Sequence, residues 1–307
     1  MSQIEKTDSI TKAELEAIRD KYRQRRYDEC LREVKSKLKQ SPNSLHLLNY
    51  QAMAYSALKR DKEALSSYLK IIKKDPTLAG PYYNMGVILK RNERLEEAID
   101  YYKKAISLKA DYVQAYNNLG VLYKDSEKYE DAIKMFMKAK ALQPDHQNSY
   151  YNLALIKKEQ GLYEEAIEFL LMVLDLNPEH SGAKSNAKSI SNDVGINFHN
   201  EGKYEAALKY FKIITLLAPK EYFGFYNIGN SYLELKDFQN AKTNFKIALK
   251  FAPKNEQIHS NLGEVYRNIG KIEKALKCYN KAIKINPGNP NNLYNMAVLL
   301  REEGQIS

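Results

Sequence analysis

Six asparagines and one aspartate recur at a nearly fixed interval along the 307-residue chain. They are Asn84, Asn118, Asn152, Asp193, Asn227, Asn261 and Asn295. Successive members are 34 residues apart, except for a step of 41 between the third and the fourth. An asparagine amide offers two hydrogen-bond donors and one acceptor, which suits the N–H and C=O groups of a peptide backbone. A row of these amides could therefore grip an extended polypeptide segment irrespective of its side chains.

Three other kinds of side chain follow the same interval beside these amides. Rings precede the amide at Tyr83, Tyr151 and Tyr226, apolar side chains follow it at Val87, Val121 and Leu155, and lysines follow at Lys90, Lys124 and Lys158. Tyrosine combines a large contact area with a polar tip, and an apolar line on an exposed face favours contact with a partner. The lysines would favour an acidic peptide. The tyrosines could equally pack between neighbouring helices, and the lysines could be solvated.

One structural unit, repeated along the chain, must position these side chains. Prolines mark its length, because Pro144 and Pro178, Pro219 and Pro253, and Pro253 and Pro287 are each 34 residues apart. Within a unit, apolar or small residues recur at three- and four-residue steps, which is typical of one face of a helix. In residues 113–146 a first helix carries Tyr116, Leu119, Gly120 and Tyr123, and a second carries Ala132, Phe136 and Ala139. Proline ends the second helix.

This unit resembles the tetratricopeptide repeat (TPR). That family has a large residue at unit position 4, Leu-Gly or Leu-Ala at 7 and 8, Tyr at 11, Ala at 20, an aromatic residue at 24, Ala at 27 and Pro at 32. In residues 222–255 these are Phe225, Ile228, Gly229, Tyr232, Ala241, Phe245, Ala248 and Pro253. The resemblance implies an all-α fold, an α-solenoid of stacked TPR helix-turn-helix repeats forming a right-handed superhelix. The array is most similar to the superhelical TPR region of O-GlcNAc transferase-type proteins.

The repeat divides the sequence into segments. We expect a flexible N-terminus at 1–10, a degenerate unit at 11–44, four units at 45–180, three at 188–289, and an incomplete unit at 290–307 that marks a truncation point or an end covered by a partner. Residues 181–187 are an insertion, and their helix-compatible composition predicts a longer first helix instead of a loose linker. No pair can cover its own apolar stripe, so each must bury it on the next.

The recurring amides occupy unit position 6 of each first helix. With about 100° per residue, positions 4, 7, 8 and 11 cluster on the packing side, and position 6 lies roughly 150° away. The resemblance implies that this open face lines a concave groove. Asparagine at position 6 is also common across the repeat family, so the amides could instead be a feature of the helix surface.

The sequence contains no pattern typical of catalysis or metal binding. Its five histidines form no metal-spaced pair, and it has no phosphate-binding glycine loop and no GxSxG elbow. Two distant cysteines argue for a reducing compartment and against a cysteine-built zinc site. No apolar run of membrane-spanning length is present, and the start is unlike a secretion signal. We therefore expect a cytoplasmic protein without enzymatic activity, metal or cofactor.

The net charge of +10 brings acidic partners and nucleic acid into consideration. The lysines alternate with acidic residues along the whole chain, however, and the unit lacks the grammar of RNA-binding pentatricopeptide arrays, so nucleic acid is the less expected partner. Chaperone-binding TPR domains clamp a C-terminal carboxylate with a set of lysines and asparagines that does not occur in these units. Heat-shock chaperone tails are therefore not expected as ligands, and neither is a membrane.

The sequence thus predicts a non-catalytic scaffold that binds extended protein or peptide segments, including acidic ones, in a concave groove lined by asparagines. A second interpretation is the substrate-recruiting N-terminal array of a larger transferase, either a glycosyltransferase or a sulfotransferase, which the incomplete last unit would permit. An RNA-binding helical repeat is the third interpretation.

Overall fold

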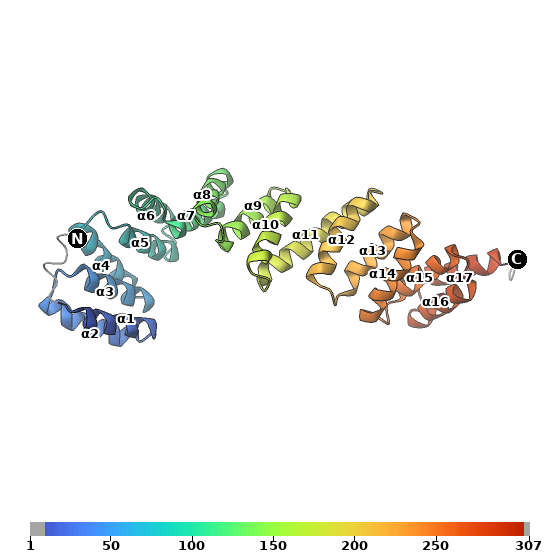
Figure 1. Cartoon of the computed structure of the whole chain (residues 1–307), viewed down its shortest axis with the longest axis horizontal. Helices are drawn as coiled ribbons and strands as arrows, with labels where there is room; N and C mark the ends of the chain where they lie inside the picture. Colours follow the sequence, from blue (N-terminus) through green and yellow to red (C-terminus); the bar gives the residue numbers. More distant parts are fainter. Residues whose placement is uncertain (1–9, 304–307) are drawn as a thin grey trace. The chain divides into compact units, whose positions relative to one another are not determined.

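The computed structural model describes residues 10–303. The segment 1–10, predicted to be flexible, lies outside the described residues except for Ile10, and so do the last four residues of the incomplete unit. In the described range the chain forms seventeen α-helices and no strand (Figure 1). Consecutive helices pack against each other along the chain. The predicted fold class, an all-α solenoid of stacked helix pairs, is confirmed.

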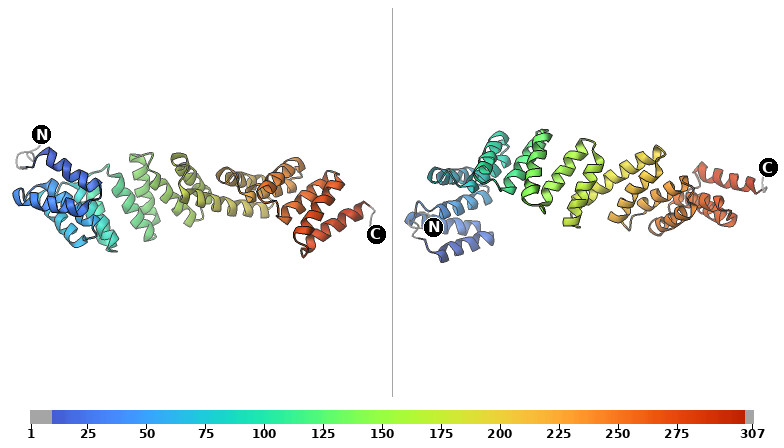
Figure 2. Two further views of the ribbon diagram at one scale, coloured as in Figure 1. Left: turned by 90° about the horizontal axis from the view of Figure 1, so that it is seen from below. Right: turned by 45° about the horizontal axis from the view of Figure 1, so that its top comes forward.

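The chain divides into two compact units, residues 1–156 and residues 157–307. The N-terminal unit contains α1 (Lys12–Arg23), α2 (Tyr27–Gln40), α3 (Leu45–Ala57), α4 (Asp61–Lys74), α5 (Ala79–Arg91), α6 (Leu95–Leu108), α7 (Val113–Asp125), α8 (Tyr129–Leu142) and most of α9 (Gln147–Glu159). The C-terminal unit contains α10 (Tyr163–Leu176), α11 (Ser181–Asn200), α12 (Tyr204–Leu217), α13 (Tyr222–Glu234), α14 (Phe238–Phe251), α15 (Glu256–Asn268), α16 (Ile272–Ile285) and α17 (Pro290–Glu302). Within each unit, every helix pair packs on the next pair (Figure 2).

Helix lengths follow the repeat, with 13 residues in the first helix of a typical pair and 14 in the second. The exception is α11, which has 20 residues and begins at Ser181. The seven residues 181–187 therefore continue the first helix of their pair. Ala183 and Ala187 are fully buried, which shows that the additional turns pack against the rest of the unit.

The turn inside each pair contains one residue with a left-handed backbone. These residues are Arg25, Lys59, Glu93, Glu127, Gly161, Gly202, Lys236 and Gly270, all with φ between 58° and 76°. Five of the eight carry a side chain that disfavours this conformation. The packing of the two helices, more than the choice of residue, therefore sets the turn.

A small residue on the first helix meets a buried ring on the second. A Cβ atom added to Gly86 of α5 would lie 2.7 Å from Cε1 of Tyr102 on α6, and Tyr102 is fully buried. Gly120 of α7 and Phe136 of α8 repeat the arrangement at 2.8 Å. The glycine allows the two helices to approach closely enough to enclose the ring, which explains the spacing of these residues in the sequence.

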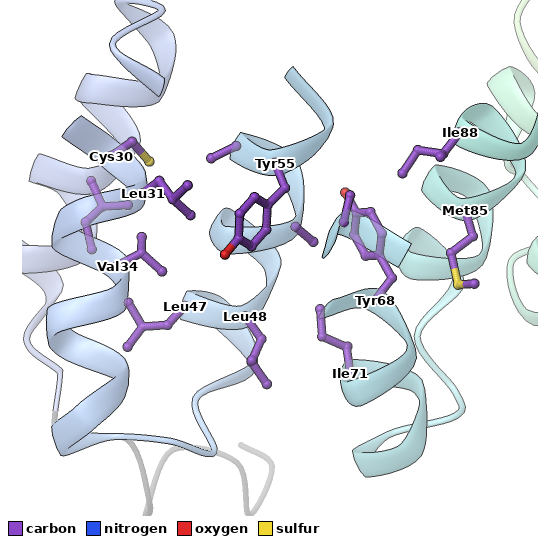
Figure 3. Packing of buried hydrophobic residues seen from close by; sticks show 14 residues of the cluster. Cys30, Leu31, Val34, Leu47, Leu48, Tyr55, Tyr68, Ile71, Met85 and Ile88 are labelled. Atoms are coloured by element: carbon purple, nitrogen blue, oxygen red, sulfur yellow. The ribbon is translucent and has the colours of Figure 1, made fainter. Parts of the chain in front are cut away.

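Between pairs, the apolar stripe of one second helix is covered by the next first helix. In the N-terminal unit, Val34 of α2 packs with Leu47 of α3, and Tyr68 of α4 lies between its own helix and Met85 of α5 (Figure 3). Met85 and Ile88 both belong to this cluster and are nearly inaccessible to solvent. Each pair therefore depends on its neighbours for a closed core.

Acid should loosen the first helix pair through Glu14. The ion pair with Lys37 and the hydrogen bonds from Thr11 lower the pKa of Glu14 from 4.5 to about 2. A carboxylate whose pKa is depressed by folding stabilises the fold above its unfolded pKa and loses that contribution as the pH falls through the folded pKa. We expect amide protection in α1 to fall between about pH 4.5 and pH 2.

The Glu14→Gln variant should show this loss already at neutral pH and respond less to acid, as measured by NMR of the α1 amides. Glu16→Gln, on the same helix but outside the cap at Thr11, is the matched control. An unchanged acid response in Glu14→Gln would show that other carboxylates govern the stability of α1.

Candidate functional site

The predicted residues lie on one face of the first helices, which we call the first-helix face. In the N-terminal unit it comprises Tyr83, Asn84, Val87 and Lys90 on α5, Asn118, Val121 and Lys124 on α7, and Tyr151, Asn152 and Leu155 on α9. All of these are half-buried. In the C-terminal unit it comprises Lys158, Asp193, Tyr226, Asn227, Asn261 and Asn295, of which Lys158 and Asp193 are exposed and the others half-buried.

Three of the asparagines donate hydrogen bonds to the preceding first helix. Asn118 Nδ2 lies 3.2 Å from Tyr83 Oη, and Asn261 Nδ2 lies 3.4 Å from Tyr226 Oη. Asn295 Nδ2 lies 3.1 Å from Ser260 Oγ. Each donor and acceptor are 35 residues apart, so unit position 6 bonds to position 5 of the preceding unit. The structure thus brings two of the predicted tyrosines together with two of the predicted asparagines.

These bonds leave part of each amide available. Asn118 also donates to Tyr102 Oη at 3.5 Å, and Asn261 donates to Asn230 Oδ1 at 2.8 Å. Both contacts use the Nδ2 group, so the Oδ1 atom of each amide has no printed partner among the described residues and can accept a bond from a peptide N–H. The amides therefore tie neighbouring first helices together and still present acceptors.

The remaining members of the row differ from one another. Burial raises the pKa of Tyr68 on α4, and a hydrogen bond between its side chain and Asn84 acts in the opposite direction. Asn152 Nδ2 donates to the carbonyl oxygen of Asn148 on its own helix at 2.9 Å. Asp193 accepts a long bond of 3.5 Å from Asn192. The side chain of Asn227 forms no hydrogen bond with any residue in the described part of the chain, because the equivalent ring below it, Phe211, lacks a hydroxyl group.

Two hollows open on the first-helix face at the same place in the repeat. The hollow in the N-terminal unit measures about 210 Å³ and is lined by Tyr22, Met53, Ser56, Ala57, Lys59, Tyr68, Asn84, Val87 and Arg91. The hollow in the C-terminal unit measures about 130 Å³ and is lined by Ile196, His199, Asn200, Phe211, Asn227 and Asn230. Both combine positions 9, 12 and 24 of one unit with positions 6 and 9 of the next.

Sequence analysis missed several residues of these hollows, among them Arg91 and Asn200 at unit position 13. The signal was available, since position 13 lies beside positions 6 and 9 on the helical wheel. The aromatic residue at position 24 was identified only as a packing residue, and in both hollows its ring also forms part of the wall. The hollow between two units therefore uses the same ring that holds a helix pair together.

His199 has a defined hydrogen-bonding state at the edge of the second hollow. Its Nδ1 lies 3.1 Å from Ser231 Oγ, and Ser231 Oγ in turn donates to the carbonyl oxygen of Asn227 at 3.1 Å. The single hydroxyl proton is used in that second bond, so His199 must donate from Nδ1. Burial lowers the pKa of His199, which favours the neutral ring with Nε2 as an acceptor.

The charges on the first-helix face are partly neutralised. Lys124 Nζ lies 2.9 Å from Asp125 Oδ1, and Arg91 is paired with Asp61. Lys158 Nζ lies 3.0 Å from the amide oxygen of Asn186, so its charge is not balanced by a carboxylate there. Lys90 forms no ion pair with any residue between positions 10 and 303. Lys90 and Lys158 are therefore the lysines of the face that can pair with an acidic ligand.

Among residues 10–303, no cluster of three or more histidine, cysteine or acidic side chains has the geometry to hold a metal ion. None of the helices in this range is both long enough and apolar enough to cross a bilayer. Cys30 and Cys278 are unpaired, and burial raises the pKa of each thiol to about 11. Such thiols are poor nucleophiles at neutral pH.

Comparison with solved structures places the chain among repeat proteins. The crystal structure of MamA is 26% identical, and the match covers 52% of this chain and 94% of that chain with a TM-score of 0.48. A tetratricopeptide repeat protein from Parabacteroides merdae ATCC 43184 is 16% identical, with coverages of 83% and 98% and a TM-score of 0.46. YrrB, described as a TPR protein with an unusual peptide-binding site, is 21% identical, with coverages of 75% and 98% and a TM-score of 0.35.

Family models identify the repeat directly, although no curated protein matches the chain significantly. Models described as tetratricopeptide repeat match residues 50–77, 77–145, 147–180, 224–255, 257–289 and 278–307. Together they span more than half of the chain. The helix pairs, the small residue facing a buried ring, and these matches agree, and the chain belongs to the tetratricopeptide repeat family.

Proposed function

We propose that the chain is a non-catalytic scaffold that binds an extended segment of a protein partner on the first-helix face. The observation that carries this proposal is the pair of hollows at the same repeat position, each containing one of the recurring asparagines, Asn84 and Asn227. Hollows in register with a 34-residue repeat suit a ligand that is itself repetitive, and a peptide backbone is such a ligand.

The chemistry of the face also supports a peptide. Half-buried amides present acceptors for backbone N–H groups, as at Asn118 and Asn261, and half-buried apolar side chains such as Val87 and Val121 offer contact for the side chains of the ligand. Lys90 and Lys158 add positive charge without a carboxylate partner, so acidic segments should bind best. Exposed charges of this kind contribute mainly to the rate of association and to specificity.

The partner segment can be found by photo-crosslinking. A benzophenone amino acid at Val121 of α7 should capture it, whereas the same group at Met137, an exposed residue of α8, should not. The captured segment is then identified by mass spectrometry and synthesised for affinity measurements. Equal capture from both positions would contradict binding at the first-helix face.

Alanine substitutions then separate binding from stability. Asn227→Ala removes no hydrogen bond within the described chain, so it should leave the melting temperature unchanged and weaken the synthesised segment about threefold to tenfold. Asn280→Ala, at an exposed position on α16, is the matched control and should change neither quantity.

Asn118→Ala should behave differently, because it also removes the bond to Tyr83. We expect a loss of about 0.5–1.5 kcal/mol in the free energy of unfolding together with weaker binding. If Asn227→Ala lowers the melting temperature and leaves the affinity unchanged, the amides serve only the stack, and the proposed function is wrong.

A further inference from the structure

The seven-residue insertion creates a hollow that lies away from the first-helix face. It measures about 410 Å³ and lies entirely within the C-terminal unit. Its lining residues are Ser181, Lys184, Ser185, Lys188, Leu217, Ala218, Pro219, Lys220 and Glu221. We call it the edge hollow. It shares no residue with the two hollows described above, so a ligand here would be bound independently of them.

The added turns of α11 form one wall of the edge hollow, and the turn between α12 and α13 forms the other. Ala183 and Ala187 are fully buried and fix these turns against the unit. Lys184 and Lys188 are four residues apart, so they lie on the same side of the helix. Lys220 reaches the hollow from the opposite wall, 36 positions after Lys184 in the sequence. Without the insertion, Ser181, Lys184 and Ser185 would have no helix to hold them here.

The edge hollow carries an excess of positive charge. Lys188 is neutralised, since its Nζ atom lies 2.7 and 2.9 Å from the two carboxylate oxygens of Glu221. Lys184 and Lys220 are exposed, and neither forms an ion pair or a hydrogen bond with any residue of the range that the structure describes. Two lysine charges therefore face the hollow from opposite walls without a partner, and like charges so placed favour an anionic ligand between them.

Between the lysines, the edge hollow has an apolar floor. Leu217 and Ala218 are half-buried and Pro219 is exposed. Beside them Leu216 is 74% exposed, the highest value among the large apolar side chains exposed in this unit. A leucine so exposed beside a hollow provides contact area for an apolar side chain. The ligand should therefore carry both negative charge and apolar groups.

From this arrangement we infer that the edge hollow is a second binding site, which takes a short acidic segment of a protein partner whose carboxylates pair with Lys184 and Lys220 and whose apolar side chains cover Leu216 and Leu217. A polypeptide fits better than a nucleic acid, because none of the lining residues is aromatic and single-stranded nucleic acids are held largely by stacking on aromatic rings. Lys188 and Glu221 form a fixed pair at the rim, which leaves the two unpaired lysines to select the ligand.

The inference is tested by NMR titration of the full-length chain with an octapeptide of alternating glutamate and leucine. Backbone amide shifts should change at residues 181–188 and 216–221, and binding should weaken as salt is added. The same octapeptide with glutamine in place of glutamate is the ligand control. The double variant Lys184→Glu, Lys220→Glu should weaken the acidic peptide about tenfold or more, because two favourable pairs become two repulsive ones.

A matched protein control carries the same change of net charge. Lys246→Glu, Lys250→Glu on α14 alters two exposed lysines outside the edge hollow and should leave the affinity within about twofold. The inference is wrong if both double variants lose affinity equally, if the glutamine peptide binds as well as the acidic one, or if the shifts fall on the first-helix face. It is also wrong if a single-stranded RNA dodecamer displaces the acidic peptide from the edge hollow at a lower concentration than the unlabelled peptide does.

Discussion

Replacing Gly86 with leucine is expected to lower the free energy of unfolding of the N-terminal unit by about 1–3 kcal/mol. A Cβ atom at Gly86 would already lie 2.7 and 2.8 Å from Cε1 and Cδ1 of Tyr102. The Tyr102 ring is fully buried in α6 and cannot move aside without opening the pair. The equivalent residues of the preceding repeat are Ala52 and Tyr68, which indicates that a methyl group can be accommodated. Leucine adds three more carbon atoms than that site can take.

Gly80 on the same helix provides the control, since a Cβ atom there would meet no atom within 4 Å. Gly80→Leu should change the free energy of unfolding by no more than about 0.5 kcal/mol. Urea unfolding followed by circular dichroism gives the two values, and hydrogen exchange shows whether the loss is confined to α5 and α6. Equal destabilisation by both variants would mean that leucine perturbs α5 itself, and that close approach of Gly86 to Tyr102 is unimportant.

The fold could be predicted from the sequence because its contacts are local. The small residue and the ring that it meets, such as Gly120 and Phe136, are 16 residues apart and recur with the repeat. A repeated short-range pattern leaves few alternative arrangements. The same reasoning explains why helix-compatible residues at 181–187 pointed to a longer helix, and α11 has 20 residues.

The turn and the hydrogen bonds between units could not be predicted in this way. Left-handed residues such as Glu93 and Glu127 carry no glycine signal, since packing imposes their conformation. The bond from Asn118 to Tyr83 joins two units, and its existence depends on how closely the first helices approach. Sequence identifies an amide on the open face, but whether its donors go to a ligand or to a neighbouring helix is decided by distances of a few ångströms.

The edge hollow was missed for a related reason. The insertion was expected to change the pitch of the array, and attention to its length concealed the chemistry of Lys184 and Lys220. Those two residues meet only because the added turns of α11 pass beside the turn before α13. A departure from a repeat is therefore a place to look for a site that the other units lack.

Replacing Tyr279 with phenylalanine is expected to stabilise the C-terminal unit by about 1–3 kcal/mol, which is the cost of burying an unpaired hydroxyl group. Tyr279 on α16 is fully buried, and its Oη atom has no hydrogen-bond partner among residues 10–303. Burial raises its pKa to about 12, so the hydroxyl group stays neutral at physiological pH. Three equivalent positions carry Phe136, Phe211 and Phe245, all fully or almost fully buried, so phenylalanine fits this site.

The missing partner has a structural cause. In the N-terminal unit the equivalent hydroxyl groups of Tyr68 and Tyr102 are bonded to the asparagine of the next repeat, Asn84 and Asn118. After Tyr279 the corresponding asparagine is Asn295, whose amide donates to Ser260 instead. Tyr102→Phe should accordingly have the opposite sign, with a loss of about 0.5–1.5 kcal/mol from the broken bond to Asn118. Urea unfolding of the two full-length variants decides the matter, because equal destabilisation by both would show that Tyr279 has a partner, such as a bound water molecule, that its phenylalanine variant loses.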